Sequence, residues 1–259
     1  MMTHIIEYRR MLNRMGYYSY QNGLIYRHLN QEGGWNAHLD RCRNLIIKAL
    51  DYYKPVKVTV LGSGWLLELP LAQMIEKTEK VRLLDIVHPP DVINQAGTLK
   101  KVELEEVDIT GGLIKEVWQK TGEYTIFKKL QTLENIIIPE YKPDSDPGLV
   151  ISLNILTQLE SLLVAFLKKR TNISEDEYFR FRTLIQKKHI DFIKKYKSVL
   201  ITDISEIFTD NSGNLTEEPT LVTELPEGKL KEEWVWDFDL VRSDYYTKRS
   251  VLNVVCIFI

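Results

Sequence analysis

A chain of 259 residues is long enough for one large α/β domain or two small ones. Apolar residues make up 44% and charged residues 27%, a composition typical of a globular protein with a sizeable core. The formal net charge of −2 gives no overall electrostatic case for a nucleic-acid partner. The two cysteines, Cys42 and Cys256, are far apart in the sequence, which favours a reduced, cytoplasmic protein without a disulfide framework.

We expect neither end of the chain to enter a membrane. The first residues, MMTHIIEYRRML, reach charged side chains at once and lack the apolar core of a signal peptide. The final run VLNVVCIFI is apolar, but it is far shorter than the roughly 20 residues needed to span a bilayer. Its β-branched content predicts a buried strand instead.

Residues 1–37 are expected to form a helical extension ahead of the main domain, which we expect over residues 38–259. The extension is rich in Tyr and Asn and fits no single period, so one or two short helices are expected, with a break at Gly33 and Gly34. Its aromatic side chains either form a lid over a substrate pocket or pack on the back of the main domain. The sequence leaves both arrangements open.

The elements after residue 37 are predicted from hydrophobic spacing. A helix is expected over 38–53, where Lys54 and Pro55 end it, and Ser174 is expected to cap a later helix. Short apolar strands that alternate with helices are typical of a parallel sheet buried on both faces. Strands are expected at 56–61, 81–87, 102–107, 149–153 and 199–204, and helices at 71–76, 113–120, 157–169 and 174–197.

The C-terminal region departs from this alternation. Two strand-like runs, WVWDFDLVR and SVLNVVCIFI, are joined by the short polar stretch SDYYTKR, so they predict an antiparallel hairpin. We therefore predict an α/β fold: a Rossmann-like, doubly wound, mostly parallel seven-stranded sheet that ends in an antiparallel hairpin, with helices on both faces.

The stretch VTVLGSGWLLELP, residues 58–70, has the order of a nucleotide-binding loop: strand, G-x-G, helix. Gly62, Ser63 and Gly64 would present backbone N–H groups to a ligand at the carboxyl end of the strand. The third glycine of G-x-G-x-x-G is missing, since Leu67 occupies its position. Taken alone, GSG is equally compatible with a tight structural turn.

Acidic residues close the next two predicted strands. Asp85 lies 21 positions after Gly64, where a carboxylate either holds the hydroxyls of a ribose or caps the following turn. Asp108 either reaches the exocyclic amine of a purine or caps the turn at Gly111 and Gly112. Because the tips of parallel strands meet at one edge of the sheet, these residues together predict a nucleotide-type ligand there.

This order of features resembles the class I S-adenosylmethionine-dependent methyltransferases. The features are GSG, Asp85, Asp108, the strands LVISLN and VLITDI, and the terminal hairpin. The resemblance covers about residues 40–259 in topology, but only short motifs in sequence. NAD-binding Rossmann domains share the loop and the acid but do not ordinarily end in such a hairpin. The resemblance therefore implies S-adenosyl-L-methionine as the cofactor.

The resemblance also implies a part of the cofactor for each site residue. The Gly62–Gly64 loop would pass close to the methionine part, and Asp85 would hold the ribose. Asp108 and Ile109 would flank the adenine. Asn154 would lie beside the sulfonium, with a plain helix N-cap as the alternative.

The chain departs from the family pattern at the glycine loop. Members usually carry an acid where this chain has Val60, and a small residue where it has Trp65, Leu66 and Leu67. Glu68 is a candidate for the missing acid, from the far side of the loop. These departures leave open a relative that binds without catalysis.

Other polar residues favour structural interpretations. His88, ahead of the Pro89–Pro90 turn, is expected at the surface, and His189 on the flank of a helix. The histidines and cysteines lack metal-ligand spacing, so no metal site is expected. One basic stretch predicts a solvated helix face: Arg182, Lys187, Lys188, Lys194, Lys195 and Lys197.

The function predicted from the resemblance is methyl transfer from S-adenosyl-L-methionine to a small-molecule or protein substrate. SLNILTQL lacks the N/D-P-P-Y/F motif of amino-methylating nucleic-acid enzymes, so a nucleic-acid partner is not expected. The alternatives are a non-catalytic binding or scaffold protein that retains the fold, and transfer of an aminocarboxypropyl group from the same cofactor. No catalytic base is predicted, because methyl transfer needs little beyond in-line positioning. No motif indicates the methyl acceptor or the oligomeric state.

Overall fold

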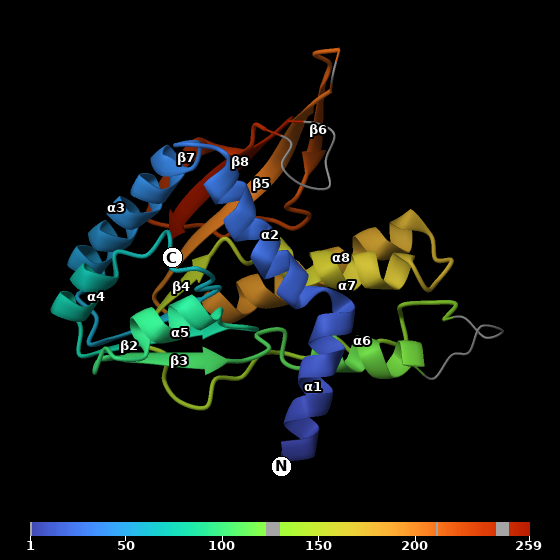
Figure 1. Ribbon diagram of the computed structural model, residues 1–259, viewed down its shortest axis with the longest axis horizontal. Coiled ribbons are helices and arrows are strands. Elements are labelled where there is room, and N and C mark those ends of the chain that lie inside the picture. The colour runs from blue at the N-terminus through green and yellow to red at the C-terminus, as the bar shows by residue number, and fades with distance from the viewer. Residues whose placement is uncertain (1, 123–129, 211, 242–248) are drawn as a thin grey trace.

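One mixed sheet organises the molecule (Figure 1). Its strands follow the order β3-β2-β1-β4-β5-β8-β7, with β6 paired to β5 off this path. The pairs from β3 to β5 in this order are parallel, and β8 is antiparallel to both β5 and β7. This computed structural model describes residues 2–122, 130–210, 212–241 and 249–259. The strands are β1 (Lys57–Leu61), β2 (Lys80–Asp85), β3 (Val102–Glu106), β4 (Leu149–Leu153), β5 (Ser198–Thr209), β6 (Leu215–Pro219), β7 (Leu230–Asp239) and β8 (Arg249–Phe258).

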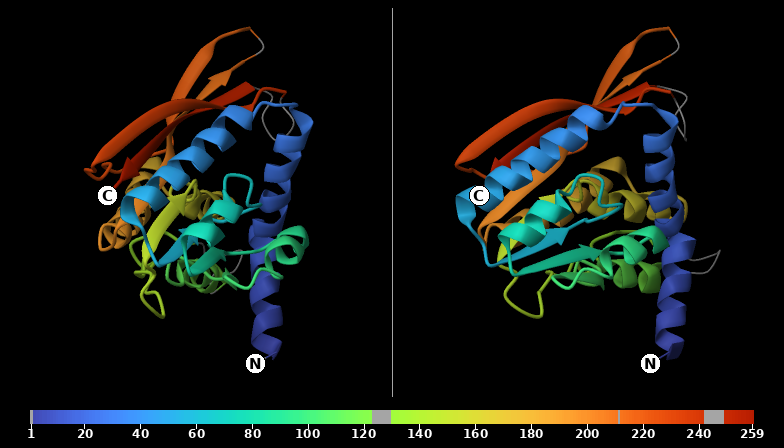
Figure 2. Two further views of the ribbon diagram at one scale, coloured as in Figure 1. Left: turned by 90° about the vertical axis from the view of Figure 1, so that its left-hand side faces the viewer. Right: turned by 60° about the vertical axis from the view of Figure 1, so that its left-hand side comes forward.

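Helices cover both faces of the sheet, and each face has its own hydrophobic core (Figure 2). Helices α3, α4 and α5 bury apolar residues on one face, and α1, α6, α7 and α8 do so on the other. Among the described residues, no helix is long and apolar enough to cross a membrane. The helices are α1 (Met2–Met15), α2 (Tyr17–Asn30), α3 (Asn36–Tyr53), α4 (Leu71–Lys77), α5 (Pro90–Ala96), α6 (Leu113–Gly122), α7 (Gln158–Lys168) and α8 (Glu175–Ile193).

The predicted fold class is confirmed, with two additional elements. Strands β1, β2 and β4 are buried along nearly their whole length, as their apolar runs indicated, whereas the parallel edge strand β3 is partly exposed. Strands β7 and β8 form the antiparallel pair. The SDYYTKR connection lies largely outside the described residues. Strand β6 makes the sheet eight-stranded; it is exposed along its length and so carries no hydrophobic alternation. Helix α5 replaces the expected Pro89–Pro90 turn, because a proline suits the first turn of a helix.

The N-terminal extension forms two helices that pack on the sheet domain. Gly16, with a φ of 94°, separates α1 from α2, and the break at Gly33 and Gly34 separates α2 from α3. From α1, Met11 and Leu12 join the core that α6, α7 and α8 bury. The boundary at residue 37 as a domain division stays a prediction.

Truncation of Leu12 tests whether the extension unfolds together with the domain. Leu12 is 2% exposed, so Leu12→Ala is expected to lower the free energy of unfolding by about 2–4 kcal/mol. Urea denaturation, followed by both circular dichroism and tryptophan fluorescence, should show one transition shifted to lower denaturant. Ile6→Ala, at a position of the same helix that is 48% exposed, is the control. A loss for Leu12→Ala as small as that of the control would contradict the docking of α1.

Candidate functional site

The glycine loop after β1 packs against the end of β4. Gly62 has a φ of 81°, and a Cβ on it would lie 2.7 Å from Ile155 Cβ and 2.8 Å from the carbonyl oxygen of Leu153. Its N–H donates to the carbonyl oxygen of Leu84 in β2 at 2.9 Å. Only glycine accommodates both the φ and this close approach. Gly62 therefore fixes the loop where the strand order reverses between β1 and β4, the usual ligand position in open α/β sheets.

Asp85, at the carboxyl end of β2, holds the second half of this loop. Its Oδ2 accepts from Gly64 N at 2.7 Å, and its Oδ1 accepts from Ile86 N at 2.7 Å. Gln21 Nε2 of α2 also donates to Oδ1, at 3.2 Å. Burial raises the pKa of Asp85, and the N–H of Gly64 opposes this rise. Asp85 thus lies beside the loop, with a side chain of α2 at its carboxylate; its role toward a ribose stays a prediction.

The bulky residues in place of the missing glycine hold the neighbouring helices. The Trp65 indole N–H donates to the carbonyl oxygen of Gln21 in α2 at 2.9 Å. Leu66 is buried in the core beneath α3, and Arg43 of α3 donates to the carbonyl oxygen of Leu67. This part of the loop therefore docks α2 and α3.

Glu68 and Asn154 line the same cavity beside the loop. The Nδ2 of Asn154 lies 3.1 Å from His38 Nε2, and its buried Oδ1 has no hydrogen-bond partner among the described residues. Burial raises the pKa of Glu68, and a hydrogen bond with the Asn154 side chain opposes the rise. The alternative of Asn154 as a helix N-cap is wrong, because Thr157 occupies the N-cap position of α7.

Asp108 has the geometry of a cap. Its Oδ1 accepts from Thr110 N at 2.9 Å, and its Oδ2 accepts from Ile114 N, in the first turn of α6, at 3.4 Å. Asp108 and the nearly buried Ile109 also line a cavity of about 40 Å³ together with Tyr17 of α2. The part that either residue would play toward an adenine stays a prediction.

Helix α2 closes the cleft that the predicted site residues surround. Two small cavities, of about 60 Å³ and about 40 Å³, lie along this cleft and share Gly62 and Asp85. Tyr17 and Gln21 of α2 line them. Sites for cofactor-sized ligands measure roughly 300–1,000 Å³. A ligand as large as S-adenosylmethionine therefore requires α2 to move away from the loop.

The polar groups along the cleft match S-adenosylmethionine in kind. The carboxylate of Asp85 is an acceptor suited to hydroxyl groups. Asn154 Oδ1 and Gln21 Oε1 line the larger of the two cavities as buried acceptors without partners among the described residues, and an ammonium group would satisfy them. A Cβ added to Gly64 would have no atom within 4 Å, so there is open space in front of the loop at this position. The residues fit the cofactor once α2 has moved.

Two histidines and one loop residue differ from their expected positions. His88 is buried instead of exposed, and its Nε2 lies 3.1 Å from Ser63 Oγ. Ser63 therefore lies behind the loop and lines neither cavity of the cleft, unlike Gly62 and Gly64. His189 is also buried, where its Nε2 lies 2.8 Å from Ser152 Oγ of β4.

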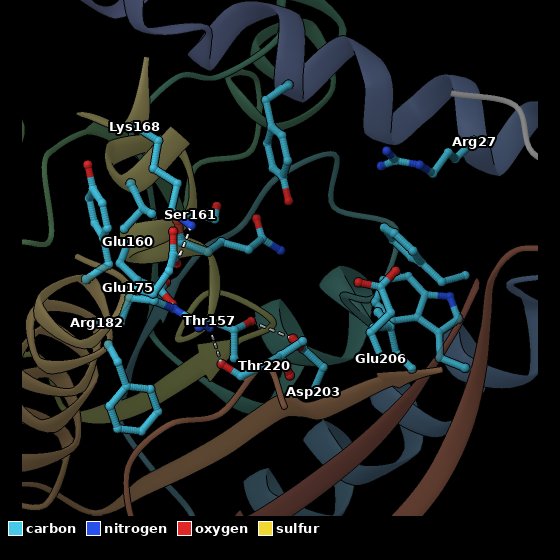
Figure 3. A pocket seen from close by; sticks show the side chains of 18 of the residues that line it. Arg27, Thr157, Glu160, Ser161, Lys168, Glu175, Arg182, Asp203, Glu206 and Thr220 are labelled. Atoms are coloured by element: carbon cyan, nitrogen blue, oxygen red, sulfur yellow. Dashed lines mark hydrogen bonds and ion pairs between the residues drawn. The ribbon is translucent and has the colours of Figure 1, made fainter. Parts of the chain in front are cut away.

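A larger cavity, of about 590 Å³, adjoins the cleft through Gln158 and Trp236, which line both. In Figure 3, Arg27 projects toward it from α2 on one side, and Glu160 of α7 lies on the opposite side. Asp203 of β5 lies below both in this view. These residues do not stand out in the sequence, because each is an isolated charge that belongs to no motif.

Arg182, expected on a solvated helix face, instead contacts Glu160 in this cavity. Its Nε donates to Glu160 Oε1 at 2.9 Å, and Gln186 Nε2 donates to the same oxygen at 3.1 Å. Glu160 is 1% exposed. Burial raises the pKa of Glu160 to about 7, and the Arg182 guanidinium opposes the rise.

This pKa makes stability depend on pH. Because the folded state holds the Glu160 proton more tightly than the unfolded state, stability falls as the pH rises from the ordinary value of 4.5 to about 7. The total is at most about 3 kcal/mol. Glu160→Gln removes this fall, so the stability of the variant relative to the wild type should increase between pH 4.5 and pH 8 in urea denaturation. Glu175→Gln, where the side chain is 78% exposed, should show no such trend. A pH-independent difference for Glu160→Gln would contradict the assignment.

Comparisons with known proteins give only distant likenesses. No family model and no curated protein matches the chain. It is similar to the solved structure of the DhpI–SAH complex, with 12% identity over 90% of this chain and 93% of that one, and a TM-score of 0.37. It is also similar to the methyltransferase domain of bacterial CtHen1, with 11% identity over 83% and 96% and a TM-score of 0.34. The third is precorrin 8W decarboxylase of Methanobacterium thermoautotrophicum, with 12% identity over 84% and 89% and a TM-score of 0.26.

With TM-scores this low, no conclusion about the chain rests on these likenesses. The fold is established by the chain's own strand order, with β1 between β2 and β4 and an antiparallel pair at one edge. In fold, the chain therefore has the Rossmann-like, doubly wound arrangement that ends in an antiparallel pair.

Proposed function

We propose that the protein binds S-adenosyl-L-methionine and transfers its methyl group to a substrate. The observation that carries the proposal is the cleft at the switch point between β1 and β4. There Gly62, Gly64, Asp85 and Asn154 line two neighbouring cavities at the carboxyl edge of the sheet. The two cysteines are free thiols, which supports a cytoplasmic location.

Each residue along the cleft would contact a different part of the cofactor. Asp85 would accept from the ribose hydroxyls, and Asn154 with Glu68 would accept from the amino group. Ile109 would pack on the adenine beside the Asp108 cap. When bound, the cofactor supplies an activated methyl group. The protein's contribution is to hold the acceptor in line and to exclude water, which needs no general base among these residues.

The closed cleft favours a second candidate function. Because Gln21 already donates to Asp85 and the cavities are small, a protein that retained the fold as a binding module would look similar. The two functions differ in whether the cleft opens to the cofactor.

Calorimetry with S-adenosylhomocysteine, the demethylated product, tests the proposal. We expect the wild type to bind it and Asp85→Asn to bind it about 10–100-fold more weakly, because hydrogen bonds to a charged acceptor are lost. Asp91→Asn, an exposed position at the start of α5, is the matched control and should bind as the wild type does. Absence of binding by the wild type, in a protein that unfolds cooperatively, would overturn methyl transfer and favour the binding module.

A second prediction concerns the hydrogen bond between α2 and Asp85. Gln21→Ala removes the donor that must leave Asp85 Oδ1 before a ribose can reach it. The association rate of S-adenosylhomocysteine should therefore rise by about fivefold, as expected for the loss of one hydrogen bond. Stopped-flow tryptophan fluorescence can follow this, since Trp65 lines the cleft. Tyr26→Ala, at a position of α2 that is 62% exposed, should leave the rate unchanged. If Gln21→Ala also left it unchanged, α2 would not limit access.

A further inference from the structure

The cavity of about 590 Å³ has an excess of negative charge. Five carboxylates and three cations line it, and each cation is within ion-pair distance of a carboxylate. Arg182 Nε lies 2.9 Å from Glu160 Oε1, and Lys168 Nζ lies 2.6 Å from Glu175 Oε2. Arg27 Nε lies 3.6 Å from Oδ2 of Asp239, a residue that does not line the cavity. Within the described part of the chain, no cation lies within ion-pair distance of the remaining three carboxylates, Asp176, Asp203 and Glu206.

A β-bulge aims two of these carboxylates at the same space. Between β5 and β8, Asp203 pairs with Val254 and Ser205 pairs with Asn253, so Ile204 is one extra residue on β5. Without the bulge, residues three apart on a strand would face opposite sides of the sheet. With it, Asp203 and Glu206 lie on one face, and Figure 3 shows both directed into the cavity.

The cavity wall contains buried polar atoms without a hydrogen-bond partner among the described residues, and Glu160 Oε2 and Trp236 Nε1 are two of them. Glu160 Oε2 is an unused acceptor on a side chain that is 1% exposed. Trp236 Nε1 is an unused donor on a side chain that is 4% exposed, and Trp236 also lines the cofactor cleft. Buried polar atoms ordinarily have partners, so each of these atoms can pair with water or with a polar group of a ligand.

Part of the remaining wall is aromatic. Trp236 and Phe238, alternate residues of β7, meet edge to face at 4.9 Å between ring centroids. Phe238 already carries the Arg27 guanidinium over its ring, 4.8 Å from the centroid. Such a wall suits an apolar or aromatic ligand body.

We infer that this cavity binds a small molecule with a protonated amine on an apolar body, with Asp203 and Glu206 as the counter-ions of the amine. This inference rests on the proposed function, for which it names the class of methyl acceptor. The ammonium group has no lone pair and only anchors the ligand; a nucleophilic atom of the ligand body takes the methyl from the sulfonium, S-adenosylhomocysteine leaves, and any proton on that atom passes to solvent. The amine N–H groups meet Asp203, Glu206 and Glu160 Oε2, and a hydrogen-bond acceptor on the ligand body meets Trp236 Nε1. Because Gln158 and Trp236 line both spaces, a ligand here lies next to the cofactor cleft.

Three probes of nearly equal shape separate charge from size. Tyramine carries an ammonium group, tyrosol carries a neutral hydroxyl in its place, and 4-hydroxyphenylacetate carries a carboxylate. In calorimetry on the full chain at pH 7.5, we expect tyramine to bind at least about tenfold more tightly than tyrosol, and the carboxylate not to bind. Asp203→Asn and Glu206→Gln keep the shape of each side chain and remove its charge. Each should weaken tyramine binding about tenfold and leave tyrosol binding unchanged.

The control variant is Glu218→Gln, which removes an exposed charge on β6 opposite Glu206 in the strand register but outside the cavity lining. It should bind tyramine as the wild type does. Equal binding of tyramine and tyrosol, absence of binding by all three probes, or a tyramine preference that survives both cavity variants would overturn the inference. Titration of the same samples with S-adenosylhomocysteine tests the proposed function separately. Binding of that ligand without tyramine would leave the function standing and reject only the amine class.

Discussion

The carboxylate of Asp85 is the contact on which the arrangement of the cleft depends. It accepts from the backbone of Gly64, from the backbone of Ile86 and from the side chain of Gln21, and so joins the glycine loop, the tip of β2 and helix α2. A buried carboxylate is costly unless such donors surround it, and here all of them come from the protein. The same group that a cofactor would use therefore also holds the closed cleft together. When the cleft opens, a hydroxyl of the cofactor would replace Gln21 as the donor to Asp85, so the buried carboxylate would keep its hydrogen bonds.

Helix α2 lines both the cleft beside the glycine loop and the larger cavity. Gln21 lies over Asp85, whereas Tyr20 and Arg27 of the same helix line the cavity of about 590 Å³. A rigid displacement of α2 large enough to admit a cofactor would therefore also change the wall of the second space. A ligand that contacts α2 better in one of its two positions then changes the affinity of the other cavity for its own ligand. Such a difference in contacts between two states is the physical requirement for coupling between two sites.

The sequence predicts the part of the structure that follows from hydrophobic patterning. The buried strands, helices α3, α6, α7 and α8 and the terminal hairpin all have recognisable apolar patterns, whereas α1 and α2 fit no single period. The strand tips with Gly62, Asp85 and Asn154 follow from strand order. Strand β6 has no apolar face, and helix α5 begins at a proline pair that is equally typical of a turn. The carboxylates of the larger cavity escape prediction for another reason. Asp203 and Glu206 share a face only because of the bulge at Ile204, and a bulge leaves no mark in the period of the sequence.

The missing third glycine has a structural explanation in the docking of α2. Leu67, at the position of the third glycine, packs against the core beneath α3, and Leu66 lies in the same core. Beside them, Trp65 donates to the backbone of Gln21 in α2. The loop keeps glycine where the backbone of β4 approaches and where open space lies in front of it, at Gly62 and Gly64. It has large side chains, such as Trp65 and Leu66, where it meets the helices. The departure from the G-x-G-x-x-G pattern is therefore the loop's adaptation to a helix that covers the site, and it leaves the two positions that face the cleft as glycine.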